Sequence, residues 1–143
     1  MKTVDFLEEK DFSALIPYIK KFAEETDTPF HQHINEVSAS LMNDNVFTIL
    51  GKDDEKEGKI VAYLCGFYLN KTEFMMSQMY SEDPELTVVI GHFLDDHLHS
   101  FGIKRIVALF KHTPRTAERH GFKVERYLMA KNIEREADND KDK

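Results

Sequence analysis

The sequence is short of cysteine and of basic residues. Its one cysteine, Cys65, lies in an apolar run, so the chain can form neither an internal disulfide nor a cysteine metal cluster, and we expect a reducing compartment. Lys and Arg number 19 against 26 Asp and Glu, which gives a net charge of −7. Because phosphate backbones attract basic surfaces, this charge argues against a general nucleic-acid-binding protein.

Long apolar runs are also missing. No stretch approaches the ~18 apolar residues that span a membrane. Residues 1–9 turn acidic at once and lack the apolar core of a signal peptide. We therefore expect a cytoplasmic protein with no membrane partner.

What is present indicates a globular domain. The chain has 143 residues, 41% of them hydrophobic and 31% charged. A domain of this length buries roughly two thirds of the surface of its unfolded chain, which is enough for a real core. We predict a single domain over residues 1–133 and a charged, disordered tail over 134–143, where apolar residues are few.

Apolar periodicity and turn residues predict the order β-α-α-β-β-β-α-β-α-β, an α/β protein with a mixed sheet and helices on both faces. Ser13 is the preferred cap of the first helix, because Pro17 is tolerated only near a first turn. Gly66 interrupts a long strand and predicts a bulge. The expected strands are 3–7, 46–50, 59–69, 73–80, 103–110 and 122–132. The first expected helix begins after Ser13, and three more cover 35–42, 85–101 and 113–120. We expect a loop over 30–33 and a solvated hairpin connection over 51–58.

This order and several local strings resemble the GCN5-related N-acetyltransferase (GNAT) family. Residues 11–17 are similar to the family's first helix and 59–80 to its central hairpin. Residues 101–106 and 118–123 are similar to its helix-to-strand junction and to its Gly-Phe signature. The resemblance covers about residues 3–133 and implies a GNAT-like acyl-CoA N-acyltransferase fold. The single last strand is closer to the short members in bacteriophage genomes.

The resemblance implies acetyl-CoA as co-substrate and a primary amine, on a small molecule or a protein, as acceptor. The backbone at Met79 and Tyr80 would then hold the pantetheine arm, and the turn that contains Leu86, Thr87 and Val88 would hold the pyrophosphate. The family's pairing by edge strands implies a homodimer.

The pyrophosphate turn departs from the family pattern. Val88 and Ile90 stand where the family has two glycines, and Glu85 stands where it has Arg or Gln. Glu82 and Asp83 precede Glu85, so three carboxylates surround the expected helix start and can cap its N–H groups themselves. Two functions stay open: an acetyl-CoA-dependent N-acyltransferase, or a catalytically degenerate GNAT-fold protein that binds or regulates.

Other side chains are candidates for the chemistry. Ala117 falls where the family has its proton-donating Tyr, so we consider His112 for proton transfer and Arg115 for the phosphates. Glu73 opens the central strand and is a candidate general base. His31 and His33, in the expected loop, are candidates to line the acceptor pocket.

Four potential metal ligands share one face of the helix expected over 85–101. Their spacing of i, i+3, i+4 and i+7 suits a metal site, but the outer face of a helix is polar by default. We therefore favour a solvated face and expect no metal. The four residues are His92, Asp95, Asp96 and His99.

Overall fold

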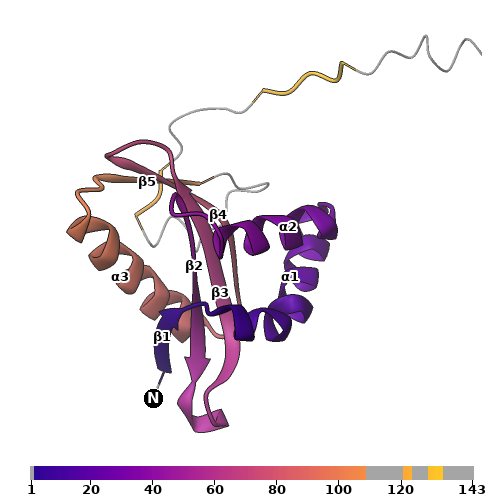
Figure 1. The fold of residues 1–143 in the computed structure, drawn as a ribbon, viewed down its shortest axis with the longest axis vertical. Helices are drawn as coiled ribbons and strands as arrows, with labels where there is room; N and C mark the ends of the chain where they lie inside the picture. The colour runs from indigo at the N-terminus through magenta and orange to yellow at the C-terminus, as the bar shows by residue number, and fades with distance from the viewer. Residues whose placement is uncertain (1, 109–120, 124–128, 134–143) are drawn as a thin grey trace, which may run out of the picture. The chain divides into compact units, whose positions relative to one another are not determined.

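The computed structural model describes residues 2–108, 121–123 and 129–133 (Figure 1). The chain divides into two compact units, residues 1–112 and 113–143. Every helix and strand described below belongs to the first unit. In the second unit Gly121 has a φ of 88°, a conformation that favours glycine and suits the turn predicted there.

A five-stranded sheet in the order β1-β2-β3-β4-β5 forms the centre of the first unit. The strands β1 to β4 are antiparallel to their neighbours, while β5 runs parallel to β4, as predicted from the helix that crosses between them. The strands are β1 (Lys2–Phe6), β2 (Val46–Asp53), β3 (Lys59–Tyr68), β4 (Glu73–Ser81) and β5 (Arg105–Ala108).

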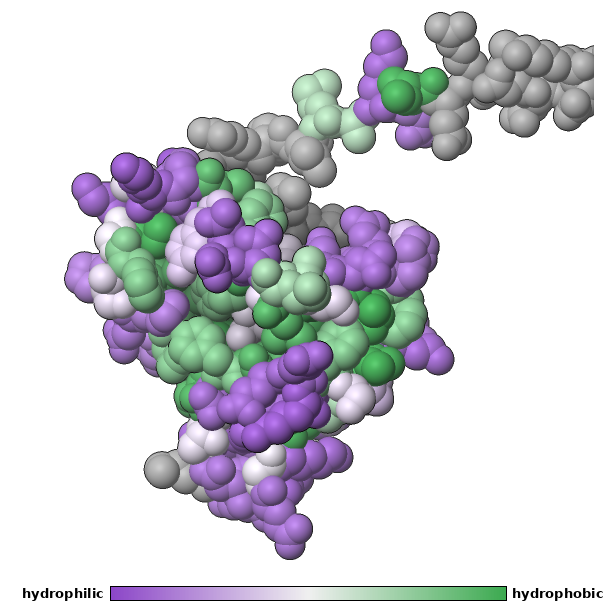
Figure 2. Space-filling view, in the orientation of Figure 1, coloured by the Kyte–Doolittle hydropathy of each residue, from purple (hydrophilic) through white to green (hydrophobic). Residues whose placement is uncertain are grey.

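Helices cover both faces of this sheet. The helix α3 (Pro84–Ser100) lies on one face, and α1 (Phe12–Thr26) and α2 (Phe30–Ser40) lie on the other (Figure 1). Two short 3₁₀ turns, η1 (Glu9–Asp11) and η2 (Asp54–Lys56), precede α1 and join β2 to β3. The hairpin end that carries η2 is hydrophilic, as predicted for a solvated connection (Figure 2). Residues 51–53, which were expected in this connection, instead extend β2, where Gly51 and Asp53 are buried.

The packing of α3 follows from its sequence period. Its fully apolar stripe, Leu86, Ile90, Leu94 and Leu98, recurs every four residues and is buried against the sheet. Burial of each such side chain stabilises the fold by roughly 1.5–3 kcal/mol. Because Asp83 caps the helix and Pro84 occupies its first position, the start of α3 is sharply defined.

A bulge lies at Gly66, as the sequence predicts. The register between β3 and β4 shifts there, and Ser77 of β4 is the extra residue. The Ser77 hydroxyl donates to the carbonyl of Cys65 at 3.0 Å. A Cβ on Gly66 would overlap the ring of Phe74, which explains why glycine is needed at this position.

The bulge changes which residues of β4 face which helices. Before it, Phe74 and Met76 pack into the core beneath α3. After it, Met79 joins that core, whereas Gln78 and Tyr80 contact residues of the α1–α2 layer. One extra residue therefore turns two polar side chains toward α1 and α2.

Three other details of the prediction are wrong. The N-cap position of α1 is Asp11 rather than Ser13, without a capping bond from its side chain, and Pro17 lies inside the helix on its exposed side. Residues 30–33 form the first turn of α2 rather than a loop, because burial of His33 with Val37 defines a helical face that polar residue types conceal. The described residues of the expected last strand, 122–123 and 129–132, are not in a strand; a strand exists only where another backbone pairs with it.

The fold class itself is confirmed, with the meander over 46–80 and the helices on both faces. The helix expected over 113–120 and residues 124–128 of the expected last strand lie outside the described residues. Among the described helices, none is long and apolar enough to cross a membrane.

Candidate functional site

A polar row follows the bulge along one face of β4. It consists of Gln78 and Tyr80 in β4 and Glu82 just after it, which alternate with residues that face the other way. Gln78 contacts α2, the Tyr80 ring lies 6.1 Å from that of Tyr18 in α1, and Glu82 pairs with Lys21 in α1. The row thus places polar groups between the sheet and the helices.

Gln78 is the centre of a buried hydrogen-bond network. The Tyr63 hydroxyl donates to Gln78 Oε1 at 2.9 Å, and Gln78 Nε2 donates to the His33 carbonyl at 3.3 Å and to the Glu36 carboxylate. Gln78 is 1% exposed and Tyr63 is fully buried, so burial raises the pKa of the Tyr63 phenol well above its usual range. The Glu36 side chain is 38% exposed and connects the network to solvent.

His33 has one ring nitrogen bonded and the other free. Its Nε2 pairs with the hydroxyl of Thr28, while no described residue hydrogen-bonds to its Nδ1, which lies 4.0 Å from a carboxylate oxygen of Glu36. The residue is only 7% exposed. Burial lowers the pKa of His33, against a smaller opposing effect of the Glu36 charge. A neutral imidazole that donates from Nε2 to Thr28 keeps a lone pair on Nδ1 and can accept a proton.

The outer end of the polar row is charged. Lys21 Nζ lies 3.6 Å from a Glu82 carboxylate oxygen and 5.5 Å from the centre of the Tyr18 ring. Burial raises the pKa of the Tyr18 phenol, and the Glu82 charge raises it further. Anionic groups on a ligand would therefore meet Glu82 at this end.

The start of α3 is capped from within. The Asp83 carboxylate accepts from the backbone N–H of Glu85 at 2.9 Å, and the Asp83 carbonyl accepts from Thr87 N–H at 3.1 Å. Pro84 has no N–H to offer. Glu85 and Thr87 thus use their N–H groups inside the protein, and Leu86 between them is fully buried.

Asp83 is itself anchored by a lysine. Lys2 Nζ lies 2.8 Å from Asp83 and 2.8 Å from Asp53, so one cation bridges two carboxylates from different parts of the chain. Hydrogen bonding to Lys2 is the main reason why the pKa of Asp83 and that of Asp53 lie below their ordinary values. The same contacts raise the pKa of Lys2 well above its usual range.

The described residues that were predicted to hold the co-substrate lie at the end of β4 and in the first turns of α3. Met79 pairs with Leu64 and Tyr80 with Tyr63, past the bulge. The predicted pyrophosphate residues are inside the first turns of α3, where Leu86 is fully buried and Val88 is 42% exposed. His112 and Arg115 lie outside the described residues.

Glu73 does not join this group. It opens β4 at the far end, where it accepts a hydrogen bond from Asn70 at 3.0 Å and lies 3.8 Å from Arg105. At about 3.3 Å per residue, Glu73 and Tyr80 are separated by roughly 20 Å of strand.

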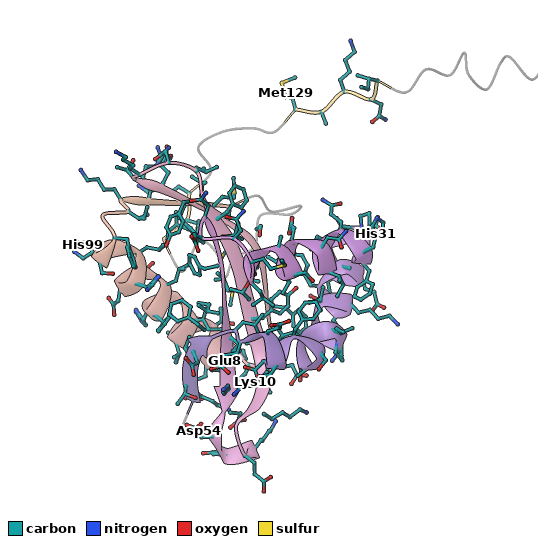
Figure 3. All side chains as sticks on the ribbon, viewed as in Figure 1. Glu8, Lys10, His31, Asp54, His99 and Met129 are labelled. Atoms are coloured by element: carbon teal, nitrogen blue, oxygen red, sulfur yellow. The ribbon has the colours of Figure 1, made fainter. Side chains whose placement is uncertain are left out.

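The two predicted acceptor-site histidines are separated as well. His31 is exposed, whereas His33 is buried, because residues two apart on a helix point about 200° apart. Figure 3 shows His31 at the outer edge of the α1–α2 layer.

The four potential ligands on α3 are all exposed on its outer face, where Figure 3 shows His99. The part of the chain that the structure describes has no group of three or more His, Cys, Asp or Glu residues that could hold a metal ion.

Sequence reasoning missed Tyr63, Glu36 and Gln78. The one available signal was Gln78 itself, a polar residue in the largely apolar run 73–80. A buried amide side chain in a strand needs hydrogen-bond partners, so its presence there predicts a polar contact. Which side chains pair with it depends on the register of three other elements.

Comparison with known proteins gives structural matches but none in sequence. No family model and no curated protein matches the sequence. A ribosomal-protein-alanine N-acetyltransferase from Brucella melitensis biovar Abortus has a TM-score of 0.70 at 11% identity, covering 94% of this chain and 99% of that one. An aminoglycoside 6'-N-acetyltransferase from Acinetobacter baumannii has a TM-score of 0.69 at 12% identity, covering 94% and 100%.

A third match is a predicted acetyltransferase from Clostridium acetobutylicum, described with acetyl-CoA. Its TM-score is 0.66 at 15% identity, and the match covers 93% of this chain and 97% of that one. At these identities the matches establish the fold. The chain has the GNAT acetyltransferase fold that its sequence resembles.

Proposed function

We propose that this protein is an N-acetyltransferase that transfers the acetyl group of acetyl-CoA to a primary amine on a small molecule or a protein. The observation that carries the proposal is the match in fold to acetyltransferases over almost the whole of both chains. The named neighbours act on an alanine of a ribosomal protein and on an aminoglycoside, and both names imply an amine acceptor. The buried polar network around Gln78 supports chemistry on the same strand.

On the donor side, the thioester arm lies along β4 at Met79 and Tyr80. The described part of β5 pairs only with residues 73–76 of β4, so no described strand pairs with residues 77–81 on that edge. Backbone groups there can bond the amides of a pantetheine arm without any particular side chain.

On the acceptor side, the amine approaches from the α1–α2 face. Its nitrogen attacks the thioester carbonyl, the new C–N bond forms, the C–S bond breaks and its electron pair leaves with the sulfur. The proton released by the nitrogen passes first to the Glu36 carboxylate, whose side chain is 38% exposed, and from there to the buried Nδ1 of neutral His33, 4.0 Å away. The sulfur takes a proton as it leaves, the role we propose for His112.

His33 replaces Glu73 as the proposed base because of its position. The His33 backbone carbonyl accepts from Gln78 in the middle of β4 and its ring lies 4.0 Å from Glu36, which Gln78 also contacts, whereas Glu73 is paired at the far end of the strand. Thr28, which bonds to His33, also lines an open hollow between the end of α1 and the start of α2. Exposed His31, near that hollow, is proposed to contact the acceptor.

The experiment is an acetyl-transfer assay against a panel of small amines and peptides, with the products identified by mass. Wild type is compared with His33→Gln and with His99→Gln, a matched change at an exposed histidine of α3. Removal of a general base lowers kcat by about 10²–10⁴-fold, and we expect this for His33→Gln alone.

Two results would count against the proposal in different ways. Equal rates for both variants would remove His33 as the base. A lack of any acetylated product, together with no change in thermal stability at millimolar acetyl-CoA, would contradict the enzymatic function and leave a binding or regulatory protein.

A further inference from the structure

The start of α3 does not fit the phosphates of acetyl-CoA. A helix start binds phosphate through free backbone N–H groups and its positive dipole end. Here the Asp83 carboxylate accepts from Glu85 N–H at 2.9 Å, the Asp83 carbonyl accepts from Thr87 N–H, and Pro84 has none. An internal anion thus holds the place that a phosphate group would take.

This internal cap is fixed from two directions. Lys2 of β1 bridges Asp83 to Asp53 at the end of β2, with both N–O distances 2.8 Å. Ser81 closes the other side: its hydroxyl donates to the Asp83 carbonyl at 2.7 Å and accepts from Asp83 N–H at 3.1 Å. Displacement of Asp83 by a phosphate would break these contacts together.

The surroundings add negative charge. Glu82 and Glu85 flank Asp83, and Lys2 and Lys21, the lysines found against this turn, are already paired with Asp83 and Glu82. Leu86 and Ile90 are fully buried, so the backbone cannot open toward a ligand without exposing the core. A pyrophosphate here would meet three carboxylates.

The thioester arm has no such obstacle. Recognition through the backbone of β4 at Met79 and Tyr80 involves neutral amide groups and depends on no charge. The two halves of acetyl-CoA therefore face unlike surfaces: the arm meets a strand edge that no described strand covers, and the phosphates meet a capped acidic turn.

We propose that the protein recognises its acyl donor through the thioester-bearing arm and not through phosphates at α3, so that phosphate-free acyl thioesters are donors nearly as good as acetyl-CoA. This inference rests on the proposed function and narrows its donor class. The transfer is the same for either donor: the C–N bond forms, the C–S bond breaks and the thiol is released.

The test compares acetyl-CoA with S-acetylpantetheine, which has the same arm and no phosphate, using one acceptor amine and the full chain. We expect kcat/KM values within about tenfold of each other, because phosphate contacts contribute little. A preference for acetyl-CoA above about 100-fold would overturn the inference and leave the proposed function intact. No product and no binding with either donor would overturn both.

The variant Asp83→Asn tests whether the Asp83 charge is what disfavours the phosphates of acetyl-CoA. Asparagine also caps helices, so the fold is retained while one negative charge is removed. We expect the preference for acetyl-CoA over S-acetylpantetheine to rise about tenfold in this variant, since a phosphate then meets less repulsion. Glu9→Gln, at an exposed acid of η1, is the matched control and should leave the ratio unchanged. An unchanged ratio in Asp83→Asn would contradict the role of Asp83.

Discussion

The two faces of the sheet are built from different chemistry. Beneath α3 lies an apolar cluster with aromatic contacts such as Phe47 on Phe74 at 4.7 Å between ring centres, and the buried Asp53 is linked through Lys2 to Asp83 at the start of α3. Beneath α1 and α2, buried apolar residues share the space with buried polar ones, which are His33, Ser40, Thr48 and Gln78. The strands are the same; the helices that cover them differ.

This difference separates the two tasks of the fold. Apolar packing is non-directional and tolerates no water, so the α3 face contributes stability. A buried polar network is directional and costs free energy unless every member is paired, so the α1–α2 face is held in one arrangement and keeps reactive groups. Substitutions on the two faces should therefore have different consequences.

The largest effect is expected on the apolar face. Phe74 is fully buried and packs against Phe47 and Tyr68, so Phe74→Ala should lower the free energy of unfolding by about 3–5 kcal/mol. Urea denaturation measures this loss of unfolding free energy. Phe101, which is 64% exposed, is the control, and Phe101→Ala should cost under about 0.5 kcal/mol. Equal losses would contradict a core centred beneath α3.

The bulge gives the next effect. A Cβ at Gly66 overlaps the Phe74 ring and the Met75 carbonyl, so Gly66→Ala should cost about 1–3 kcal/mol. Gly51→Ala is the milder comparison and should cost less, because its Cβ would lie 3.1 Å from the nearest atom, Ala62 Cβ, whereas at Gly66 it would overlap the Phe74 ring. The acetyl-transfer rate should also fall in Gly66→Ala, since the bulge sets the direction of Gln78. A stable Gly66→Ala with full activity would refute this link.

On the polar face, the stability of the fold should depend on whether buried hydrogen-bonding groups keep their partners, more than on side-chain volume. Tyr63→Phe removes the donor to Gln78 Oε1, and Gln78→Met leaves the Tyr63 hydroxyl unpaired; each should cost about 1–3 kcal/mol. The double variant should cost less than the sum, because no buried partner of this bond is left alone. Unfolding free energies of the four proteins in the cycle test this. Additive losses would show that the bond does not couple the two residues.

The smallest effect is a pH dependence shared by both faces. Burial lowers the pKa of His33 on one face and of His97 on the other below the ordinary 6.5. The unfolded chain then takes up protons first as the pH falls through 6.5, so stability is unaffected above this pH and decreases below it.

Urea midpoints at about pH 7.5 and about pH 5.5 measure the decrease. His97→Phe and His33→Gln should each reduce it, and only His33→Gln should also remove the acidic limb of the acetyl-transfer rate. A decrease that persists in the double variant would assign it to other groups.

Much of the architecture could be predicted from the sequence. The meander over 46–80, the apolar stripe of α3, the parallel β5 and the bulge at Gly66 depend on residues close together in the chain. Short-range periodicity and glycine placement specify them. The start of α2 was missed because His33 is polar by type and buried only through its contacts. The predicted homodimer and cytoplasmic location rest on sequence alone.

The sequence by itself determined the order of elements from β1 to β5, the chain's acidity and the carboxylates around the start of α3. Only the tertiary structure decided that Gln78 faces His33 and Glu36, and that Lys2 holds Asp83 as an internal cap. The physical reason is register. A single extra residue in β4 reverses the side to which the following side chains point, and contacts between distant segments exist only after the sheet has set that register.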